Sequence, residues 1–203
     1  MKITPAERPR IAAYIPLVLV LLLALALRLL LWGRIPRTGM ISDEGEYLSA
    51  ASWLAQGRGF SWYQGYLWTR APVYPLFVAV HLRLFGDTLM PIYFTQMILS
   101  LLNVVLVYLL AQWLPSEGRR KTDDRRPAHR SVPVLSALLM ALYLPFALYA
   151  QVLLSETLFI TLLLAGFLAL ARWVEDPRTK DQGPRTKDGA WRLDVGGWWL
   201  VFA

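Results

Sequence analysis

The sequence predicts an all-α protein, a polytopic bundle of transmembrane helices with interfacial helices in the first outer loop. Hydrophobic residues make up 56% of the 203 residues and the mean hydropathy is +0.42, which is too apolar for an ordinary soluble domain. The apolar residues gather in long runs, and the basic residues behind the net charge of +7 cluster between these runs. Such clusters indicate membrane topology rather than a surface for nucleic acid. The chain has no cysteine, which excludes disulfides and thiolate chemistry.

Residues 11–33 form the first apolar run and are predicted to be the first transmembrane helix, after a short tail at residues 1–10. At about 1.5 Å per residue, a helix of this length crosses a hydrocarbon layer of roughly 30 Å. The run is longer than the apolar core of a signal peptide and lacks its cleavage site, so we expect an uncleaved span. Its only charged residue, Arg28, is expected to reach the lipid headgroups from near the end of the helix, and contact with a phosphate is the alternative.

Of the apolar segments that follow, the first is too short to cross a membrane. Residues 72–86 also carry His81 and Arg83, so they are predicted to form an interfacial or re-entrant helix. The later segments are long enough to span. The predicted spans are residues 90–114, 132–150 and 152–173, with the start of a fifth at residues 195–203. Because that last segment is cut short, we expect the chain to be the front part of a longer protein.

The basic residues predict the orientation of the bundle. Most Lys and Arg residues lie in the tail and in two predicted loops, residues 115–131 and 174–194, which therefore belong on the cytoplasmic side. The second loop repeats Pro-Arg-Thr-Lys-Asp and is expected to be flexible. Residues 34–71 then form an outer loop, and Glu156 lies on the same outer face.

Two adjacent carboxylates in the outer loop, Asp43 and Glu44, are the first candidates for catalysis. Apolar residues recur at helical spacing after Asp43 and the pattern ends at Gly57, which predicts a short interfacial helix with both acids in its first turn. A structural role is the alternative, because Asp43 and Glu46 have the spacing of a capping box and acids stabilise a helix N-terminus.

Three further features of the outer face indicate ligand binding, and each has a structural alternative. The aromatic residues fit either a carbohydrate platform or an interfacial belt. Arg70 could hold a phosphate or anchor the chain at the interface. Glu156 is costly at membrane depth without a partner, but with Ser155 it could also cap a helix. The aromatic residues are Trp53, Phe60, Trp62, Tyr63, Tyr66, Trp68 and Tyr74.

This ordered set of motifs resembles that of the membrane-embedded C-type glycosyltransferases. The likeness is to the family 39 group of protein mannosyltransferases and lipid A aminoarabinose transferases, and to the related lipopolysaccharide-core galacturonosyltransferases. Residues 43–47 (Asp-Glu-Gly-Glu-Tyr) are similar to the acid motif of the family's first loop, residues 70–77 to its basic-Pro-Pro segment, and residues 155–159 (Ser-Glu-Thr-Leu-Phe) to its second outer-loop acid. Ala71 stands where the family often has proline, and Glu156 where many members have aspartate.

The resemblance implies an enzyme of the plasma membrane, in bacteria the inner membrane, with a cytoplasmic N-terminus. Such enzymes move a sugar, with inversion, from a polyprenyl-phosphate donor to a hydroxyl or amine of a lipid, glycan or protein acceptor on the outer face. Asp43 would be the general base and Arg70 would offset the charge of the departing phosphate. Asp43 and Glu156 could share a divalent cation; no other cofactor and no nucleic-acid partner is expected. The expected substrate-binding residues are Glu44, Tyr47, Arg70, Tyr74 and Glu156.

Two other functions remain open at the level of sequence. The chain could be a non-catalytic membrane protein, such as part of a transporter or an assembly scaffold, or an inactive fragment of the transferase. Transporters tend to place functional charges in the middle of the membrane, whereas the acids here lie at the ends of spans, which favours the transferase.

Overall fold

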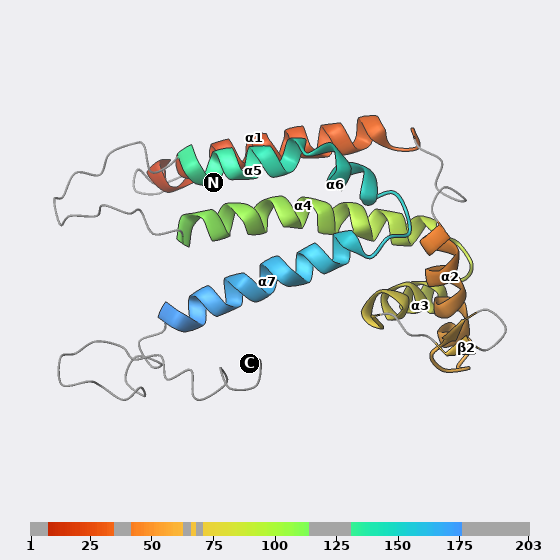
Figure 1. Cartoon of the computed structure of the whole chain (residues 1–203). Coiled ribbons are helices and arrows are strands. Elements are labelled where there is room, and N and C mark those ends of the chain that lie inside the picture. Colours follow the sequence, from red (N-terminus) through yellow and green to blue (C-terminus); the bar gives the residue numbers. More distant parts are fainter. Residues whose placement is uncertain (1–7, 35–41, 63–65, 68–70, 114–130, 176–203) are drawn as a thin grey trace, which may run out of the picture.

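The computed structural model describes residues 8–34, 42–62, 66–67, 71–113 and 131–175, and this part of the chain is almost entirely helical (Figure 1). The predicted helical class is therefore confirmed for these residues, in which the β structure is one antiparallel pair of two-residue strands. The elements are α1 (Arg8–Leu31), α2 (Ser42–Ala55), β1 (Ser61–Trp62), β2 (Tyr66–Leu67), α3 (Val73–Phe85), α4 (Met90–Trp113), α5 (Ser131–Leu142), α6 (Leu144–Tyr149) and α7 (Glu156–Glu175).

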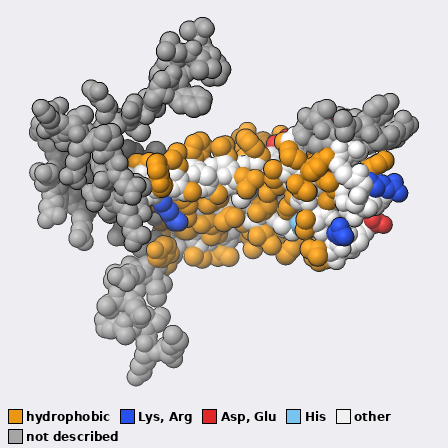
Figure 2. All heavy atoms as spheres, turned by 90° about the horizontal axis from the view of Figure 1, so that it is seen from below, with side chains coloured by type: hydrophobic (Ala, Val, Ile, Leu, Met, Phe, Trp, Pro, Cys, Tyr) orange, Lys and Arg blue, Asp and Glu red, His pale blue; other side chains and the backbone are white. Residues whose placement is uncertain are grey.

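Among the helices of the described residues, three are long and apolar enough to cross a membrane. They cover Tyr14–Leu31 in α1, Met90–Trp113 in α4 and Glu156–Val174 in α7. On the face shown in Figure 2, hydrophobic side chains cover the middle of the molecule, and the visible arginine side chains of the described residues lie towards its two ends. This distribution indicates a membrane protein, since apolar side chains face outwards where a soluble protein would expose polar ones.

The long helices run side by side, with α4 in the centre, α1 and α5 along one side of it and α7 along the other (Figure 1). Small side chains allow α1 and α5 to approach α4 closely, because Ala24, Ala137 and Ala141 are fully buried around Val104. A second core joins α2, α3 and the start of α4 and centres on Tyr74, Val78 and Ile92, among others.

Helices α2 and α3 lie at one end of this bundle, which we call the α2–α3 end (Figure 1). Helix α1 finishes there, and α4 begins there. The segment between α6 and α7, residues 150–155, also lies at this end, where it contacts α2. The predicted acids at positions 43, 44 and 156 are therefore on helices that meet at one end of the molecule.

The structure corrects the helix expected at residues 132–150. This range is divided into α5 and α6, and Tyr143 between them has an extended backbone (φ −68°, ψ 100°). Pro145 explains the break, since proline has no N–H for the helical hydrogen bond and clashes with the preceding turn. The next helix starts at Glu156 rather than at residue 152, so that residues 150–155 are left as a connecting segment.

Candidate functional site

Glu44 joins α2 to the segment at residues 150–155. It lies in the first turn of α2 and is 4% exposed, and its Oε1 accepts a hydrogen bond of 3.1 Å from the backbone N–H of Leu153. Its other oxygen, Oε2, is buried and has no hydrogen-bond partner within the described ranges. A buried carboxylate oxygen without a donor is costly, so this atom is suited to bind a ligand or water.

Tyr47, one turn further along α2, contacts both the connecting segment and α3. Its hydroxyl lies 3.2 Å from Oγ of Ser155, and its ring packs edge-on against the ring of Tyr74, with 4.8 Å between the centroids. Three of the predicted substrate-binding residues, Glu44, Tyr47 and Tyr74, are thus brought together from two helices.

Tyr74 continues this network into α4. Its hydroxyl donates a hydrogen bond of 2.7 Å to Oε1 of Gln96, and Nε2 of Gln96 donates to the carbonyl oxygens of Val152 at 2.7 Å and Ala150 at 3.4 Å. Burial raises the pKa of Tyr74 well above its ordinary value, and the nearby Tyr93, Tyr47, Glu156 and Glu44 raise it further. The phenol therefore stays neutral and acts as a hydrogen-bond donor at physiological pH.

Glu156 is the first residue of α7 and completes the group of predicted acids that approach Tyr74. The side chain is half-buried, and its Oε2 has no hydrogen-bond partner in the described part of the chain. We call Glu44, Tyr47, Tyr74, Gln96 and Glu156, together with residues 150–155, the glutamate–tyrosine site. It contains two carboxylates, on different elements, that each have one buried oxygen without a hydrogen-bond partner among the residues that the structure describes.

Asp43 lies next to Glu44 in the first turn of α2 and is half-buried. Arg70, the predicted phosphate ligand, lies outside the described residues. No group of three or more His, Asp or Glu side chains close enough to hold a metal ion occurs within the described ranges. The divalent cation considered for Asp43 and Glu156 therefore stays a prediction, and we derive no step through a metal.

A row of buried polar residues on α4 was not predicted from the sequence. Gln96, Ser100 and Asn103 are at most 2% exposed and lie on one face of the helix at spacings of four and three residues. Gln96 bonds to α3 and to the connecting segment, Ser100 to α1 and α6, and Asn103 to the carbonyl oxygen of Thr157 in α7. Polar residues at helical spacing inside an apolar run are the signal by which this row could have been found.

The expectation that Arg28 reaches the headgroups is wrong. This side chain is 1% exposed and points into the bundle, where its three nitrogens make five contacts. The acceptors are the hydroxyl and carbonyl oxygens of Ser100 and the carbonyl oxygens of Ala24 and Ala141. Since guanidinium has five N–H groups, these contacts also leave none for the phosphate considered as the alternative.

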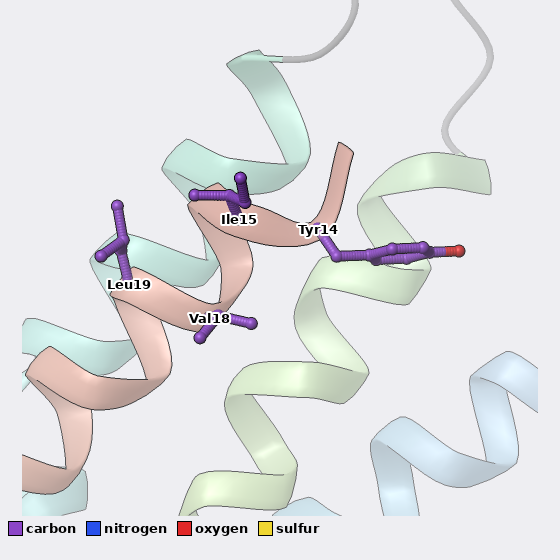
Figure 3. Close-up of a pocket in the computed structure, with 4 residues that line it drawn as sticks. All are labelled: Tyr14, Ile15, Val18 and Leu19. Carbon is purple, nitrogen blue, oxygen red and sulfur yellow. The ribbon is translucent and has the colours of Figure 1, made fainter. Parts of the chain in front are cut away.

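Gln151 links the connecting segment to the end of α1. Its Oε1 accepts a hydrogen bond of 3.0 Å from the backbone N–H of Gly33, which has a φ of +72° that suits glycine. A separate hollow of about 260 Å³ lies on α1, where Tyr14, Ile15, Val18 and Leu19 occupy successive turns (Figure 3). Its lining is apolar and comes from α1 alone, so it offers no group for chemistry.

Comparison with known proteins gives no match to a family model, to a curated protein or to a solved structure. The function must therefore be argued from the glutamate–tyrosine site and the sequence motifs that meet in it.

Proposed function

We propose that the chain is part of a membrane glycosyltransferase that moves a sugar from a polyprenyl-phosphate donor to an acceptor hydroxyl or amine, with inversion. The observation that best supports this proposal is the meeting of three separate motifs at the α2–α3 end. Glu44 and Tyr47 come from the first motif, Tyr74 from the second and Glu156 from the third. The two unpaired buried carboxylate oxygens are suited to accept hydrogen bonds from the hydroxyl groups of a sugar.

The proposal puts the α2–α3 end on the outer face of the membrane and the basic stretches in the cytoplasm. In this arrangement α3 lies along the membrane surface. One side of α3 supports this position, since Val73, Leu76, Val80 and Leu84 are 43–71% exposed and recur at helical spacing. A donor delivered within the membrane would then reach the site from the side of this helix.

In the proposed reaction, Asp43 takes the proton of the acceptor hydroxyl or amine as that atom attacks the anomeric carbon. The bond from this carbon to the phosphate oxygen breaks, and the polyprenyl phosphate leaves with the bonding electrons. Arg70 offsets the charge of the leaving phosphate. Tyr74 remains a neutral phenol that donates a hydrogen bond to Gln96, and its oxygen can accept a hydrogen bond from a substrate hydroxyl. Glu44 and Glu156 hold sugar or acceptor hydroxyl groups.

Sugar transfer by membranes that contain the full-length protein tests the proposal. The probes are radiolabelled mannose, aminoarabinose and galacturonic acid, each linked to polyprenyl phosphate. We expect Asp43→Asn to lower transfer by about 10²- to 10⁴-fold, because a general base is lost. Asp87→Asn is the matched control, since Asp87 is an exposed aspartate outside the site and its amide variant should retain transfer. Transfer near the wild-type rate by Asp43→Asn would show that Asp43 is not the base.

A non-catalytic membrane protein is the second candidate, and one observation favours it. The bond between Glu44 and the Leu153 N–H shows that an acid of the first motif has a structural task. If the whole motif were structural, no probe would be transferred by the wild-type protein, and Asp43→Asn would change only the thermal stability of the bundle.

A further inference from the structure

The break between α5 and α6 deprives the backbone carbonyl of Ala141 of its helical partner. In a continuous helix the carbonyl of Ala141 would accept a hydrogen bond from the N–H of residue 145, but Pro145 has no N–H. Ala141 is fully buried, so water cannot easily replace that donor. Inside an apolar bundle such a carbonyl needs a donor from another element.

Arg28 supplies that donor from α1. Its Nη1 lies 3.5 Å from the carbonyl oxygen of Ala141 and 3.0 Å from that of Ala24. Its Nε and Nη2 donate to Oγ of Ser100 at 3.0 Å and 2.8 Å. The Ser100 hydroxyl in turn donates to the carbonyl oxygen of Phe146 at 3.3 Å, on the far side of the break. Arg28 and Ser100 thus bond to the chain both before and after Pro145.

The helix after this break leads directly into the glutamate–tyrosine site. Residues 150–155 follow α6, and five of them bond to other elements: Ala150 and Val152 to Gln96, Gln151 to Gly33, Leu153 to Glu44 and Ser155 to Tyr47. These bonds require the segment to leave α6 in one particular direction. A continuous helix from α5 through α6 would point the segment elsewhere.

We propose that Arg28 is a positioning residue, which holds the α5–α6 break in place and thereby sets the path of residues 150–155 through the site. The inference concerns the shape of the site and does not depend on sugar transfer. A simpler role, in which Arg28 only holds the helices together, makes a different prediction. Its loss would then loosen the whole bundle and not the connecting segment in particular.

Cysteine labelling distinguishes these roles, because the chain has no cysteine of its own. The full chain is reconstituted in proteoliposomes with one introduced cysteine and treated with a water-soluble maleimide. Val152→Cys reports on the connecting segment and Val78→Cys, in α3, on the core of the α2–α3 end; the two valines are 6% and 0% exposed. We expect Arg28→Met to raise the labelling rate at position 152 by at least about tenfold, and that at position 78 by less than about twofold.

The Pro145→Ala background provides the decisive comparison. Alanine restores the missing N–H, so the Ala141 carbonyl can bond within the helix and no longer needs Arg28. In this background we expect Arg28→Met to change labelling at position 152 by less than about threefold. In the protein that keeps Pro145, Arg28→Lys retains a donor, so its labelling rate at position 152 should lie between those of Arg28 and Arg28→Met.

Ser100→Ala provides a second test if Arg28→Met fails to fold. This variant removes the bond to Phe146 and keeps the buried charge, and it should also raise labelling at position 152 more than at position 78. An equal rise at the two positions would overturn the inference. The inference would also be overturned if Arg28→Met changed labelling at position 152 equally in the Pro145 and the Pro145→Ala backgrounds.

Discussion

The hydroxyl of Tyr74 on α3 donates a 2.7 Å hydrogen bond to the side chain of Gln96 on α4. Gln96 is fully buried and also donates to the carbonyl oxygens of Val152 and Ala150. This one pair therefore connects a short helix, a long central helix and the segment that follows α6. Because of these bonds, the position of the glutamate–tyrosine site depends on α4.

Tyr74→Phe should destabilise the protein without changing the packing of the ring. The substitution leaves Oε1 of Gln96 buried without its donor, which costs about 1–3 kcal/mol. The free energy of unfolding in detergent measures the loss. Tyr143→Phe is the matched control, because Tyr143 is 52% exposed and should tolerate the change. Equal effects of the two substitutions would contradict the importance of the Gln96 bond.

The raised pKa of Tyr74 predicts a loss of stability at high pH. Burial is the main cause, and the folded-state pKa lies above the unfolded value of about 10. The stabilising contribution is therefore complete below a pH of about 10 and is lost as the pH rises towards the folded-state pKa, by up to about 1.4 kcal/mol per pH unit. Unfolding of wild type and Tyr74→Phe at several pH values on both sides of 10 measures the difference. Parallel pH curves would show that the phenol is not buried in this way.

Glu44→Ala and Glu44→Gln should differ in their effect on stability. Alanine removes the acceptor for the Leu153 N–H and should cost about 1–3 kcal/mol, whereas glutamine keeps an acceptor oxygen and should cost less. Gln56→Ala, at an exposed position just after α2, is a control expected to change little. The argument fails if both Glu44 variants lose the same stability.

The buried polar residues on α4 predict that two amide-to-leucine substitutions differ strongly in their effect on stability. Gln96→Leu removes a partner of Tyr74 and of two carbonyl groups, and should destabilise the protein by several kcal/mol. Asn103 makes one contact of 3.4 Å, to the Thr157 carbonyl oxygen, and its Oδ1 has no partner in the part of the chain that the structure describes. Asn103→Leu should therefore change stability by less than about 1 kcal/mol. Urea unfolding of the two variants in detergent checks this contrast.

The sequence is sufficient to locate the long helices, because runs of apolar residues alone indicate which segments form α1, α4 and α7. It does not reveal which side of each helix packs against the other helices and which side faces outwards. For this reason the sequence predicts Arg28 at the headgroups although the structure buries it, and the apolar run of α4 does not show which face carries the polar row. The sequence does not predict the α5–α6 break, because a proline in an apolar run is compatible with a continuous, kinked membrane helix.

The burial of Asp43 and Glu44 could not be predicted from the sequence either. Asp43 and Glu44 were predicted to start a helix, and they do. Neighbours on a helix point about 100° apart, so the two carboxylates leave α2 in different directions and differ in burial. Only the packing of α2 against Leu153 decides that Glu44 is the buried one. That packing joins residues more than one hundred positions apart, which no local pattern contains.

The orientation of the bundle gives the last prediction. Asp87 is exposed just before α4 begins, at the α2–α3 end, and Gln112 is exposed in the last turn of α4. A helix of 24 residues is about 36 Å long and separates these two positions by more than the hydrocarbon thickness of roughly 30 Å. If the basic stretches lie in the cytoplasm, a membrane-impermeant maleimide added to intact cells should label Asp87→Cys at once and Gln112→Cys only after the cells are opened. The reverse pattern would put the glutamate–tyrosine site on the cytoplasmic face, away from a donor presented on the outer leaflet, and would exclude the proposed transferase.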